Sequence, residues 1–401
     1  MGFLAKSANP SIVDSPQALA DMLGLSYESV TGVNVSPETA MRFTTVFSCV
    51  RVIAESIGLM PVTLKRRVGD SRVDVPNHPL DRILRVAPNE FMTAAEWHEL
   101  VGMSLAQDGN FYAWKNIVRG ELRELLPMRA ACVLPKLDEN WSVTYQVTFP
   151  NGTTRTLPAS DVLHIRLFSR DGLVGLNPIQ QNRDAIGLGI AAERQGARWF
   201  KQGTRLSGVL STDGALKDDA YKRIRTDWER TYSGDENAWK VAILEAGLKF
   251  QPVAMSAADV QWIDGRKMQR SEICGLYRVP PHKIGDLERA TFTNIEQQSL
   301  DFVIDCIVPY VVKIEQRYLV SLMSQKDQAD HYARFNLNAL LRGDMQTRAA
   351  FYMRLQQCGA LSANEIRALE DMNPREGGDV YLTPVNMAVN GEAGKDKGNA
   401  G

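Results

Sequence analysis

The sequence predicts an α+β fold of several modules, and three patterns support that prediction. Apolar residues recur every three or four positions from Val46 to Ile57, as in an amphipathic helix. Between Phe111 and Leu167 the period drops to two, and Pro150–Asn151–Gly152 separates two alternating runs as a hairpin turn. Long helical segments follow Pro178. The 401 residues exceed the size at which one core keeps growing, so several modules are expected.

The first module is expected over residues 38–177, after a loosely ordered N-terminal arm at 1–37 that is rich in Ser, Pro and Gly. Its first helix ends at Gly58, and the segment PVTLKRRV leaves it as a strand. Thr93 followed by Glu96 forms a capping box at the start of a later helix. Helices and strands together make this module α+β.

A small lobe between two helices is predicted next. Pro178 suits the first turn of a helix over 178–205, and Gly203 suits its end. Residues 206–254 give a strand, a helix and further strand, and 255–281 form the second helix. A lobe between two long helices is carried at the end of a stalk.

Three glycines in the first of these helices require an explanation: Gly187, Gly189 and Gly196. Each costs about 1 kcal/mol relative to alanine, so we expect close approach to a neighbouring helix. GLGIAA at Gly187–Ala192 also matches the GxGxxA dinucleotide pattern. That pattern needs a preceding strand and a turn at its first glycine, so helix packing is the preferred interpretation.

The same helix has a basic side. Its members are Arg183, Arg194, Arg198 and Lys201. This side could face phosphates, although a solvated helix face is the commoner meaning of such a pattern. In the lobe, three aromatic residues are either core or contacts for a protein partner: Trp228, Tyr232 and Trp239.

A polar loop and a long helix are predicted over residues 282–323. The loop is either a plain surface loop or a moving part held between two helices. Its central residues are Glu288, Arg289, Ala290, Thr291, Phe292, Thr293 and Asn294. Asn294 is predicted to cap a helix of roughly 40 Å, and Pro309 to bend it.

One apolar stripe is expected to form the buried side of that helix. Its members are Leu300, Ile304, Ile307, Val311, Ile314, Tyr318 and Leu322. A helical module over 324–385 follows, in which Ser362 and Glu365 form a second capping box. Residues 386–401 are polar, rich in Gly and expected to be disordered.

Composition and motifs give no sign of an enzyme. The net charge of -1 shows no basic excess for gripping nucleic acid, and the five histidines are dispersed without metal-ligand spacing. There is no GxxxxGK[ST] phosphate loop and no converging set of carboxylates. We therefore predict no catalytic residue, no metal and no cofactor. The five scattered cysteines and the lack of a signal peptide or membrane span indicate a soluble cytoplasmic protein with reduced thiols.

Seven segments resemble, in order, the head portal proteins of tailed bacteriophages, in the large family typical of long-tailed phages with a lambda-like head. They extend over residues 40–385. The segments are VFSCVRVIAESIGLMPVTLKRR, HPLDRILRVAPNEFMTAAEWHEL, QDGNFYAWK, LHIRLFSRDGLVGLNPI, GLYRVPPHKIGDLERATFTNIEQQSLDFV, FNLNALLRGDMQTRA and LSANEIRALEDMNP.

The resemblance implies a portal fold that assembles as a ring. In its terms 38–177 is the wing, 178–205 and 255–281 are the stem helices, and 206–254 is the clip. Residues 282–323 are the tunnel loop and tunnel helix, and 324–385 are the crown. The arm and the C-terminal tail match nothing specific.

The function implied is that of a head–tail connector. A ring of about twelve copies would occupy one capsid vertex of the virion, after assembly in the host cytoplasm. Double-stranded DNA would be packaged and later ejected through its channel without sequence specificity. The implied protein partners are the terminase large subunit, the head–tail adaptor, the major capsid protein and the scaffold, with no membrane.

Two other classes of function stay open. One is a nucleic-acid-processing enzyme of the packaging machinery, such as a nuclease, which the missing carboxylate set and phosphate loop count against. The other is a capsid or scaffold subunit, which would form shells or transient assemblies instead of rings.

Overall fold

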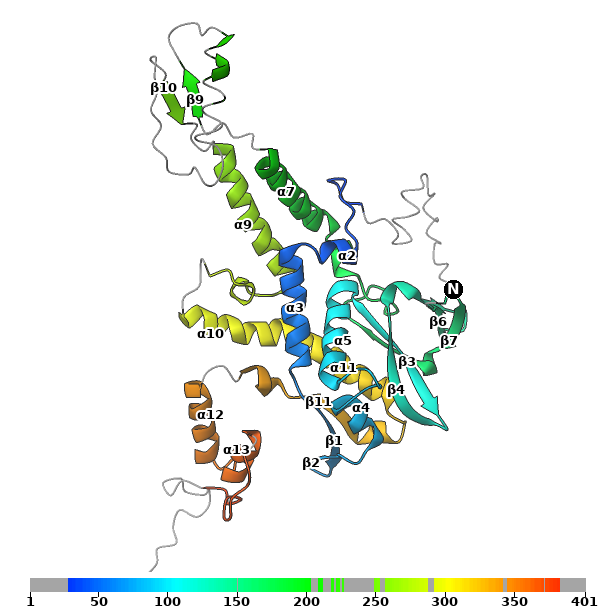
Figure 1. Ribbon diagram of the computed structural model, residues 1–401. Coiled ribbons are helices and arrows are strands. Elements are labelled where there is room, and N and C mark those ends of the chain that lie inside the picture. Colours follow the sequence, from blue (N-terminus) through cyan, green and yellow to red (C-terminus); the bar gives the residue numbers. More distant parts are fainter. Residues whose placement is uncertain are drawn as a thin grey trace, which may run out of the picture. The chain divides into compact units, whose positions relative to one another are not determined.

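A computed structural model describes most of the chain (Figure 1). The described residues are 28–149, 151–202, 208–211, 218–219, 221–223, 226, 249–252, 257–287, 292–341, 345–370 and 372–382.

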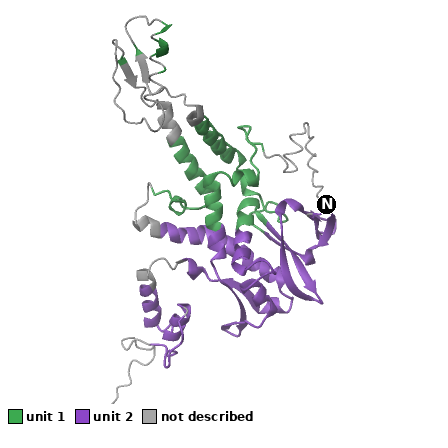
Figure 2. Ribbon diagram, viewed as in Figure 1, with its two compact units in different colours: residues 1–53, 103–110, 166–295 green, residues 54–102, 111–165, 296–401 purple. Residues whose placement is uncertain are grey.

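The chain divides into two compact units, each built from three stretches of sequence (Figure 2). Unit 1 comprises Met1–Ile53, Met103–Asn110 and Arg166–Ile295. Unit 2 comprises Ala54–Gly102, Phe111–Ile165 and Glu296–Gly401. Mixed helix and sheet structure is thus confirmed, and each unit is assembled from distant segments.

The first sheet of unit 2 joins segments that are far apart in sequence. Its strands are β1 (Val62–Val68), β2 (Ser71–Asp74) and β11 (His331–Phe335), in the antiparallel order β11-β1-β2. Leu64 and Ala333 lie opposite each other and are both buried. β11 thus shares a sheet with β1, although the sequence analysis groups its residues with the C-terminal helical module.

Two further three-stranded sheets lie mainly in unit 2. One has the order β4-β3-β8 and the other β5-β6-β7. The strands are β3 (Asn110–Val118), β4 (Glu121–Met128), β5 (Val133–Leu137), β6 (Val143–Thr148), β7 (Thr154–Pro158) and β8 (Val162–Arg166). The predicted hairpin is confirmed between β6 and β7. Gly152 has φ 80°, and its N–H donates to the Phe149 carbonyl at 2.9 Å. A cluster of Tyr112, Tyr145 and three valines packs these sheets together.

Large side chains fill the interior of unit 2. Its helices include α4 (Pro79–Arg85), much of α5 (Ala94–Asp108), the end of α3 (Thr44–Gly58) and α11 (Val308–Leu322). Trp97 is fully buried, and its indole N–H donates to the Tyr318 hydroxyl at 3.0 Å. A Cβ on Gly102 would approach the Ala54 backbone to 3.1 Å, so glycine permits close contact of α5 with α3. The predicted Thr93–Glu96 capping box is confirmed, with the Thr93 N–H donating to Glu96 at 2.7 Å.

A π-helical turn interrupts the long helix that the sequence predicts. α10 (Phe292–Asp301) leads into a π-helical segment, Phe302–Ile307, and α11 begins immediately before Pro309. Pro309 has no N–H to donate, and the Val308 N–H donates to the Val303 carbonyl five residues back. The proline therefore lies beside a wide turn, and a bend there stays a prediction.

The extra residue in that turn changes which side chains are buried. The predicted stripe is confirmed from Ile307 to Tyr318, where its members are buried. It is wrong at Leu300 and Ile304, which are 43% and 61% exposed. Phe302 and Val303 are buried in their place. A strict 3.6-residue period cannot carry a stripe across a π-helical turn.

The C-terminal helices of unit 2 are α12 (Met345–Gln357) and α13 (Ala363–Leu369). The predicted capping box at α13 is confirmed, since the Glu365 N–H donates to the Ser362 hydroxyl and Glu365 accepts from the Ser362 N–H. Short 3₁₀ turns connect other elements of the chain: Ala130–Cys132, Ala159–Asp161, Pro281–Ile284, Asp327–Ala329 and Leu337–Leu341.

Unit 1 is dominated by two helices that pair with each other, α7 (Arg183–Gln202) and α9 (Ala257–Tyr277), as Figure 1 shows. The short helices α2 (Pro37–Ala40) and α6 (Pro178–Gln181) precede α3 and α7. The predicted helix over 178–205 is therefore broken at Asn182, which separates α6 from α7. β9 (Gly208–Ser211) and β10 (Lys249–Pro252) form an antiparallel pair between α7 and α9 in sequence.

Candidate functional site

Two polar contacts join α7 and α9. Arg266 of α9 forms an ion pair with Glu193 of α7 at 3.0 Å. Near the start of α7, the Gln269 side chain donates to the Ala185 carbonyl at 3.3 Å. These contacts bridge segments that lie more than seventy positions apart, with separations of 73 and 84 residues. They fix the two helices side by side as the frame of the candidate site.

The glycines of α7 allow close contacts, but not all of them with a helix. A Cβ on Gly189 would lie 2.7 Å from the Phe43 ring and 3.3 Å from Gln269 of α9. A Cβ on Gly187 would overlap with the Ser29 side chain, which belongs to the segment before α2. Gly196 is buried. The expected approach to a neighbouring helix therefore fits Gly189, whereas Gly187 accommodates an N-terminal turn.

The basic side of α7 includes two exposed arginines. Arg194 and Arg198 are exposed, one turn apart. The two acidic residues of α7 bond elsewhere: Glu193 to α9, and Asp184 accepts the Val30 N–H at 2.9 Å. Arg183 is half-buried, and the side chain of Lys201 lies outside the described residues. Like charges spaced by four residues destabilise an isolated helix, so this face favours an anionic environment.

α9 ends in a turn with a strained residue. The Val279 N–H donates to the Cys274 carbonyl at 3.0 Å and the Arg278 N–H to the Gly275 carbonyl at 3.2 Å, the two bonds of a Schellman motif. The left-handed position, usually a glycine, is occupied by Arg278 with φ 54°. The predicted stop before Pro280–Pro281 is confirmed.

The turn that follows is tied back to α9. After Pro281–Ile284, Gly285 takes φ 85° and reverses the chain. This places Asp286 against Arg270, with an ion pair of 3.0 Å. Asp286 is largely buried, with 14% of its side chain exposed. The segment entering the predicted tunnel loop therefore starts from a fixed point.

The structure changes the predicted boundary of that loop. α10 begins at Phe292, so Phe292, Thr293 and Asn294 lie in its first turn, and Asn294 is inside the helix and does not cap it. The helix can begin earlier because nothing in the Thr-Phe-Thr-Asn run prevents helical dihedrals. Residues outside the described part include Glu288, Arg289, Ala290 and Thr291. The predicted clip contacts Trp228, Tyr232 and Trp239 also lie outside it.

A polar cavity of about 350 Å³ lies within unit 1, at the level where the α9 turn folds back. Its lining is Phe43, Thr44, Thr45, Ser48, Glu193, Arg266, Gln269, Arg270, Ile284 and Gly285. Its two cations, Arg266 and Arg270, form ion pairs with Glu193 and Asp286. The cavity therefore belongs to the frame that positions α9 and its turn.

The histidines do not form a common site. His164 stacks on Tyr112 at 4.3 Å and bonds to the Tyr145 hydroxyl at 3.2 Å, as a sheet residue would. Burial lowers the pKa of His98 to about 4, against a smaller opposing effect of the Ala94 backbone. No group of three or more His, Cys, Asp or Glu in the described part could hold a metal ion. Among the described helices, none is long and apolar enough to cross a membrane.

The pKa of one carboxyl group in unit 1 is strongly shifted. Burial raises the pKa of Asp108, at the end of α5, to about 6, and the charge of Glu38 adds to the effect. The neighbouring Asn177 amide donates to it at 3.4 Å. The packing around Asp108 therefore accounts for its raised pKa.

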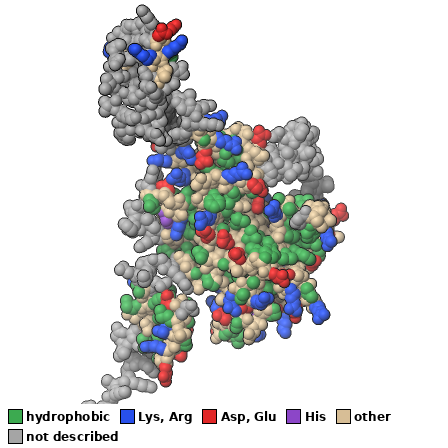
Figure 3. All heavy atoms as spheres, viewed as in Figure 1, with side chains coloured by type: hydrophobic (Ala, Val, Ile, Leu, Met, Phe, Trp, Pro, Cys, Tyr) green, Lys and Arg blue, Asp and Glu red, His purple; other side chains and the backbone are tan. Residues whose placement is uncertain are grey.

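The surface carries both signs of charge. Acidic and basic side chains are interspersed on the face drawn in Figure 3. The whole chain has 46 Lys and Arg against 47 Asp and Glu. An even distribution avoids a strong hold on a polyanion.

Residues 44–371 match the family described as phage portal protein. The chain belongs to that family. It is 31% identical over 372 residues to the portal protein of Enterobacteria phage HK97, covering 91% of this chain and 87% of the relative. It is 28% identical over 391 residues to a probable portal protein of Streptomyces phage phiC31, covering 91% and 82%.

A solved structure shares the fold. It is described as the neck of an empty gene transfer agent (GTA) particle computed with C6 symmetry. The TM-score is 0.62 at 23% identity, with 89% of this chain and 99% of that chain covered. The family membership predicted from the seven segments is thus confirmed, and neither a nuclease nor a capsid or scaffold subunit is favoured for this portal-family chain.

Proposed function

We propose that the chain is the subunit of a closed ring at one vertex of a phage capsid, through which double-stranded DNA is packaged and ejected. The match to the portal family over 44–371 carries the proposal. The relatives from HK97 and phiC31 have names that include portal protein. In this role the protein performs no chemistry of its own, and its channel, docking surfaces and moving parts do the work.

The α7–α9 pair is proposed as the stem, and the lobe at 206–254 as the clip. Pairing of two helices around a lobe that includes β9 and β10 supports this division. The exposed Arg194 and Arg198 would face the DNA, because the two acidic residues of α7, Asp184 and Glu193, bond to other segments in the described structure. Two arginines per subunit supply weak, sequence-independent contacts, which suit a duplex that must slide.

The segment at 288–291, with the first turn of α10, is proposed as the tunnel loop. The Arg270–Asp286 ion pair fixes the position at which the chain enters this segment. The clip is proposed to meet the terminase large subunit and later the head–tail adaptor. The wing, 38–177, is proposed to lie against the major capsid protein and the scaffold, and 324–385 to form the crown.

Electron microscopy of the purified protein tests the ring. We expect closed rings of about twelve subunits with a central hole. A protein that stays monomeric at high concentration would overturn the proposal, and so would closed shells.

Replacing Arg194 and Arg198 with Gln tests the stem. We expect rings of normal symmetry, with less DNA packaged or retained and a weaker salt dependence of DNA binding. Unchanged packaging would exclude these arginines from the channel. Exchange of the exposed Arg155 for Gln, in β7, is the matched control and should have no effect.

A further inference from the structure

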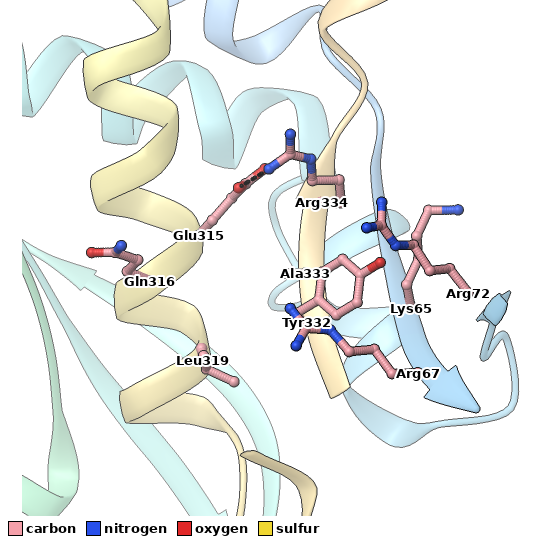
Figure 4. A pocket seen from close by; sticks show the side chains of 9 residues that line it. All are labelled: Lys65, Arg67, Arg72, Glu315, Gln316, Leu319, Tyr332, Ala333 and Arg334. Carbon is pink, nitrogen blue, oxygen red and sulfur yellow. Dashed lines mark hydrogen bonds and ion pairs between the residues drawn. The ribbon is translucent and has the colours of Figure 1, made fainter. Parts of the chain in front are cut away.

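A cavity of about 560 Å³ lies on one face of the β11-β1-β2 sheet, beside α11 (Figure 4). Figure 4 shows four cationic side chains from three strands around it, with α11 on the other side. The lining is Lys65, Arg67, Arg72, Glu315, Gln316, Leu319, Tyr332, Ala333 and Arg334. We call this set the basic groove.

Two arginines of the groove face each other across the sheet. Arg67 of β1 and Arg72 of β2 are direct partners in the antiparallel register. Like charges at directly opposed positions destabilise a sheet. The Arg67 guanidinium lies 5.4 Å from the centre of the Tyr332 ring, which holds it over the groove. The fold therefore retains two facing cations at a cost to its own stability.

The acidic residues nearby are committed to other partners. Lys65 pairs with Asp74 at 2.6 Å, and Arg334 pairs with Glu315 at 3.0 Å. Glu315 also accepts the Phe335 N–H at 2.8 Å.

The next arginine along β1 gives an internal comparison. Arg66, on the opposite face of the sheet, has an ion pair with Asp330 at 2.7 Å. Within the part of the chain that the structure describes, neither Arg67 nor Arg72 has one. The two facing arginines are thus the charges that an incoming anion would meet.

The floor of the groove is less polar than its rim. Leu319 and the Tyr332 ring contribute apolar surface. β2 is the last strand of its sheet, and all four of its residues are exposed, so its outer edge can accept another extended chain. Cations, an apolar floor and an open strand edge occur together at this place.

We propose that the basic groove binds an extended acidic segment of a partner polypeptide, with carboxylates on Arg67 and Arg72 and apolar side chains between them. The volume suits a few residues of such a segment. A carboxylate can accept two hydrogen bonds from a guanidinium. One acidic residue bound beside Arg67 and Arg72 would therefore reduce the repulsion between their positive charges. The groove lies in the regions proposed as wing, tunnel helix and crown, and it shares no residue with those proposed as stem, clip and tunnel loop.

Nucleic acid fits this groove less well than an acidic peptide. Duplex phosphates lie on a convex surface, and the phosphodiester chain has nothing to place against Leu319 and the Tyr332 ring. An alternating acidic and apolar segment uses both parts of the lining, because successive side chains of a strand point to opposite sides.

Fluorescence anisotropy with the full chain tests the proposal. The probe is a labelled peptide of alternating Asp and Val, about six residues long as in a typical strand. We expect binding that weakens with added salt, and at least about tenfold weaker binding of the Asn–Val peptide of equal length. A random-sequence DNA duplex is the second ligand.

Charge reversal locates the site. R67E and R72E should each lower affinity for the Asp–Val peptide by at least about tenfold. R155E is the matched control, since Arg155 also lies over an aromatic ring, that of Phe149 at 5.8 Å, but outside the groove. R67E places a carboxylate opposite Arg72, so its melting temperature should equal or exceed that of the wild type while peptide binding is lost.

Three outcomes would overturn the proposal. The first is equal binding of the Asp–Val and Asn–Val peptides. The second is loss of binding in R155E as large as in R67E. The third is tight duplex binding that R67E abolishes, without binding of the acidic peptide, which would make the groove a nucleic-acid surface.

Discussion

Around Trp97 in unit 2, large side chains are fully buried against one another, whereas along α7 and α9 in unit 1 an ion pair and several apolar side chains are partly exposed. Trp97, Tyr318 and Phe111 are each 0–2% exposed. Along the helix pair, Arg266 and Glu193 retain 40% and 34% of their side-chain exposure. Apolar residues such as Leu188 and Met268 are 55% and 76% exposed there.

The difference in burial between the two regions indicates which of them is stable within a single subunit. The interior of unit 2 is completed by one chain, and burial of apolar surface stabilises it. The α7–α9 pair leaves apolar and basic faces uncovered, so neighbouring subunits of the proposed ring would complete its packing. We therefore expect damage to unit 2 to affect the folded subunit, and damage to the helix pair to affect assembly.

The largest effect is expected from Trp97→Ala. The change opens a cavity and removes the donor to the Tyr318 hydroxyl, at a cost of about 3–5 kcal/mol of unfolding free energy. Denaturant unfolding measures the loss. Trp141→Ala is the control, because Trp141 is 83% exposed and its replacement should change stability by no more than about 0.5 kcal/mol. Equal effects of the two changes would contradict the ranking of the two regions.

A smaller effect is expected from Gly189→Ala in α7. The new Cβ would lie 2.7 Å from the Phe43 ring, and the strain should cost about 1–3 kcal/mol. Gly265→Ala in α9 is the matched helical control, since a Cβ there meets nothing within 4 Å. That change should stabilise by up to about 1 kcal/mol. Equal melting temperatures of the two variants would show that α7 does not pack against Phe43 as closely as described.

Asp108→Asn should show that the Asp108 carboxyl makes the free energy of unfolding depend on pH. Because the folded pKa is raised from 3.8 to about 6, the folded state binds this proton more tightly than the unfolded state. Wild-type stability is therefore lost as pH rises from about 4 through about 6, and the variant escapes that loss. We expect the variant to be more stable by on the order of 1–2 kcal/mol at pH 7.5, and equal to the wild type near pH 4.

Melting curves of both proteins across this range provide the measurement. His98 of unit 2 acts in the opposite direction, because its lowered pKa removes stability as pH falls from 6.5 towards 4. It is common to both proteins and cancels in their difference. A difference that grows at acid pH would refute the assignment to Asp108.

The smallest effect is expected from the Arg266–Glu193 ion pair. A double-mutant cycle of Arg266→Ala and Glu193→Gln should give a coupling energy of about 0.2–1 kcal/mol, reduced by salt, because both side chains are partly exposed. A coupling as large as the effect of Trp97→Ala would show that polar contacts dominate in unit 1 as well. Gln269→Ala, which removes the bond to the Ala185 carbonyl, serves as the comparison.

Local patterns allowed several correct predictions, although they missed the break at Asn182 and the π-helical turn at Phe302–Ile307. Both capping boxes, at Thr93 and Ser362, are formed, and the hairpin around Gly152 is present. These features need only residues three or four positions apart, so the sequence contains all the information required.

Features that join distant segments were not predicted. β11 pairs with β1 across more than 260 residues, and the basic groove brings Arg67 and Arg72 next to Tyr332. The spacing of apolar residues along the sequence does not indicate which distant strands pair. The run Lys65–Arg66–Arg67 was the available signal, but only the register shows that Arg66 is neutralised on one face and Arg67 is not on the other.

The functional predictions divide in a similar way. The resemblance of several collinear segments identified the family, because it draws on the whole chain. The roles of single residues can be assigned only in the assembled ring, because many copies of the chain would line its channel. For the same reason the roles of Arg194 and Arg198 stay predictions, as does the role of the tunnel loop.

The π-helical turn at Phe302–Ile307 gives the helix before it a second possible phase. One residue corresponds to about 100° of rotation around a helix axis. Returning Phe302–Ile307 to α-helical spacing would turn residues 296–301 by about that angle, while Val311, Ile314 and Tyr318 could stay buried as they are. Exposed Ile304 and buried Val303 would be the residues to exchange places. Such a rotation would exchange Val303 for Ile304 in the core and leave the buried residues of α11 in place.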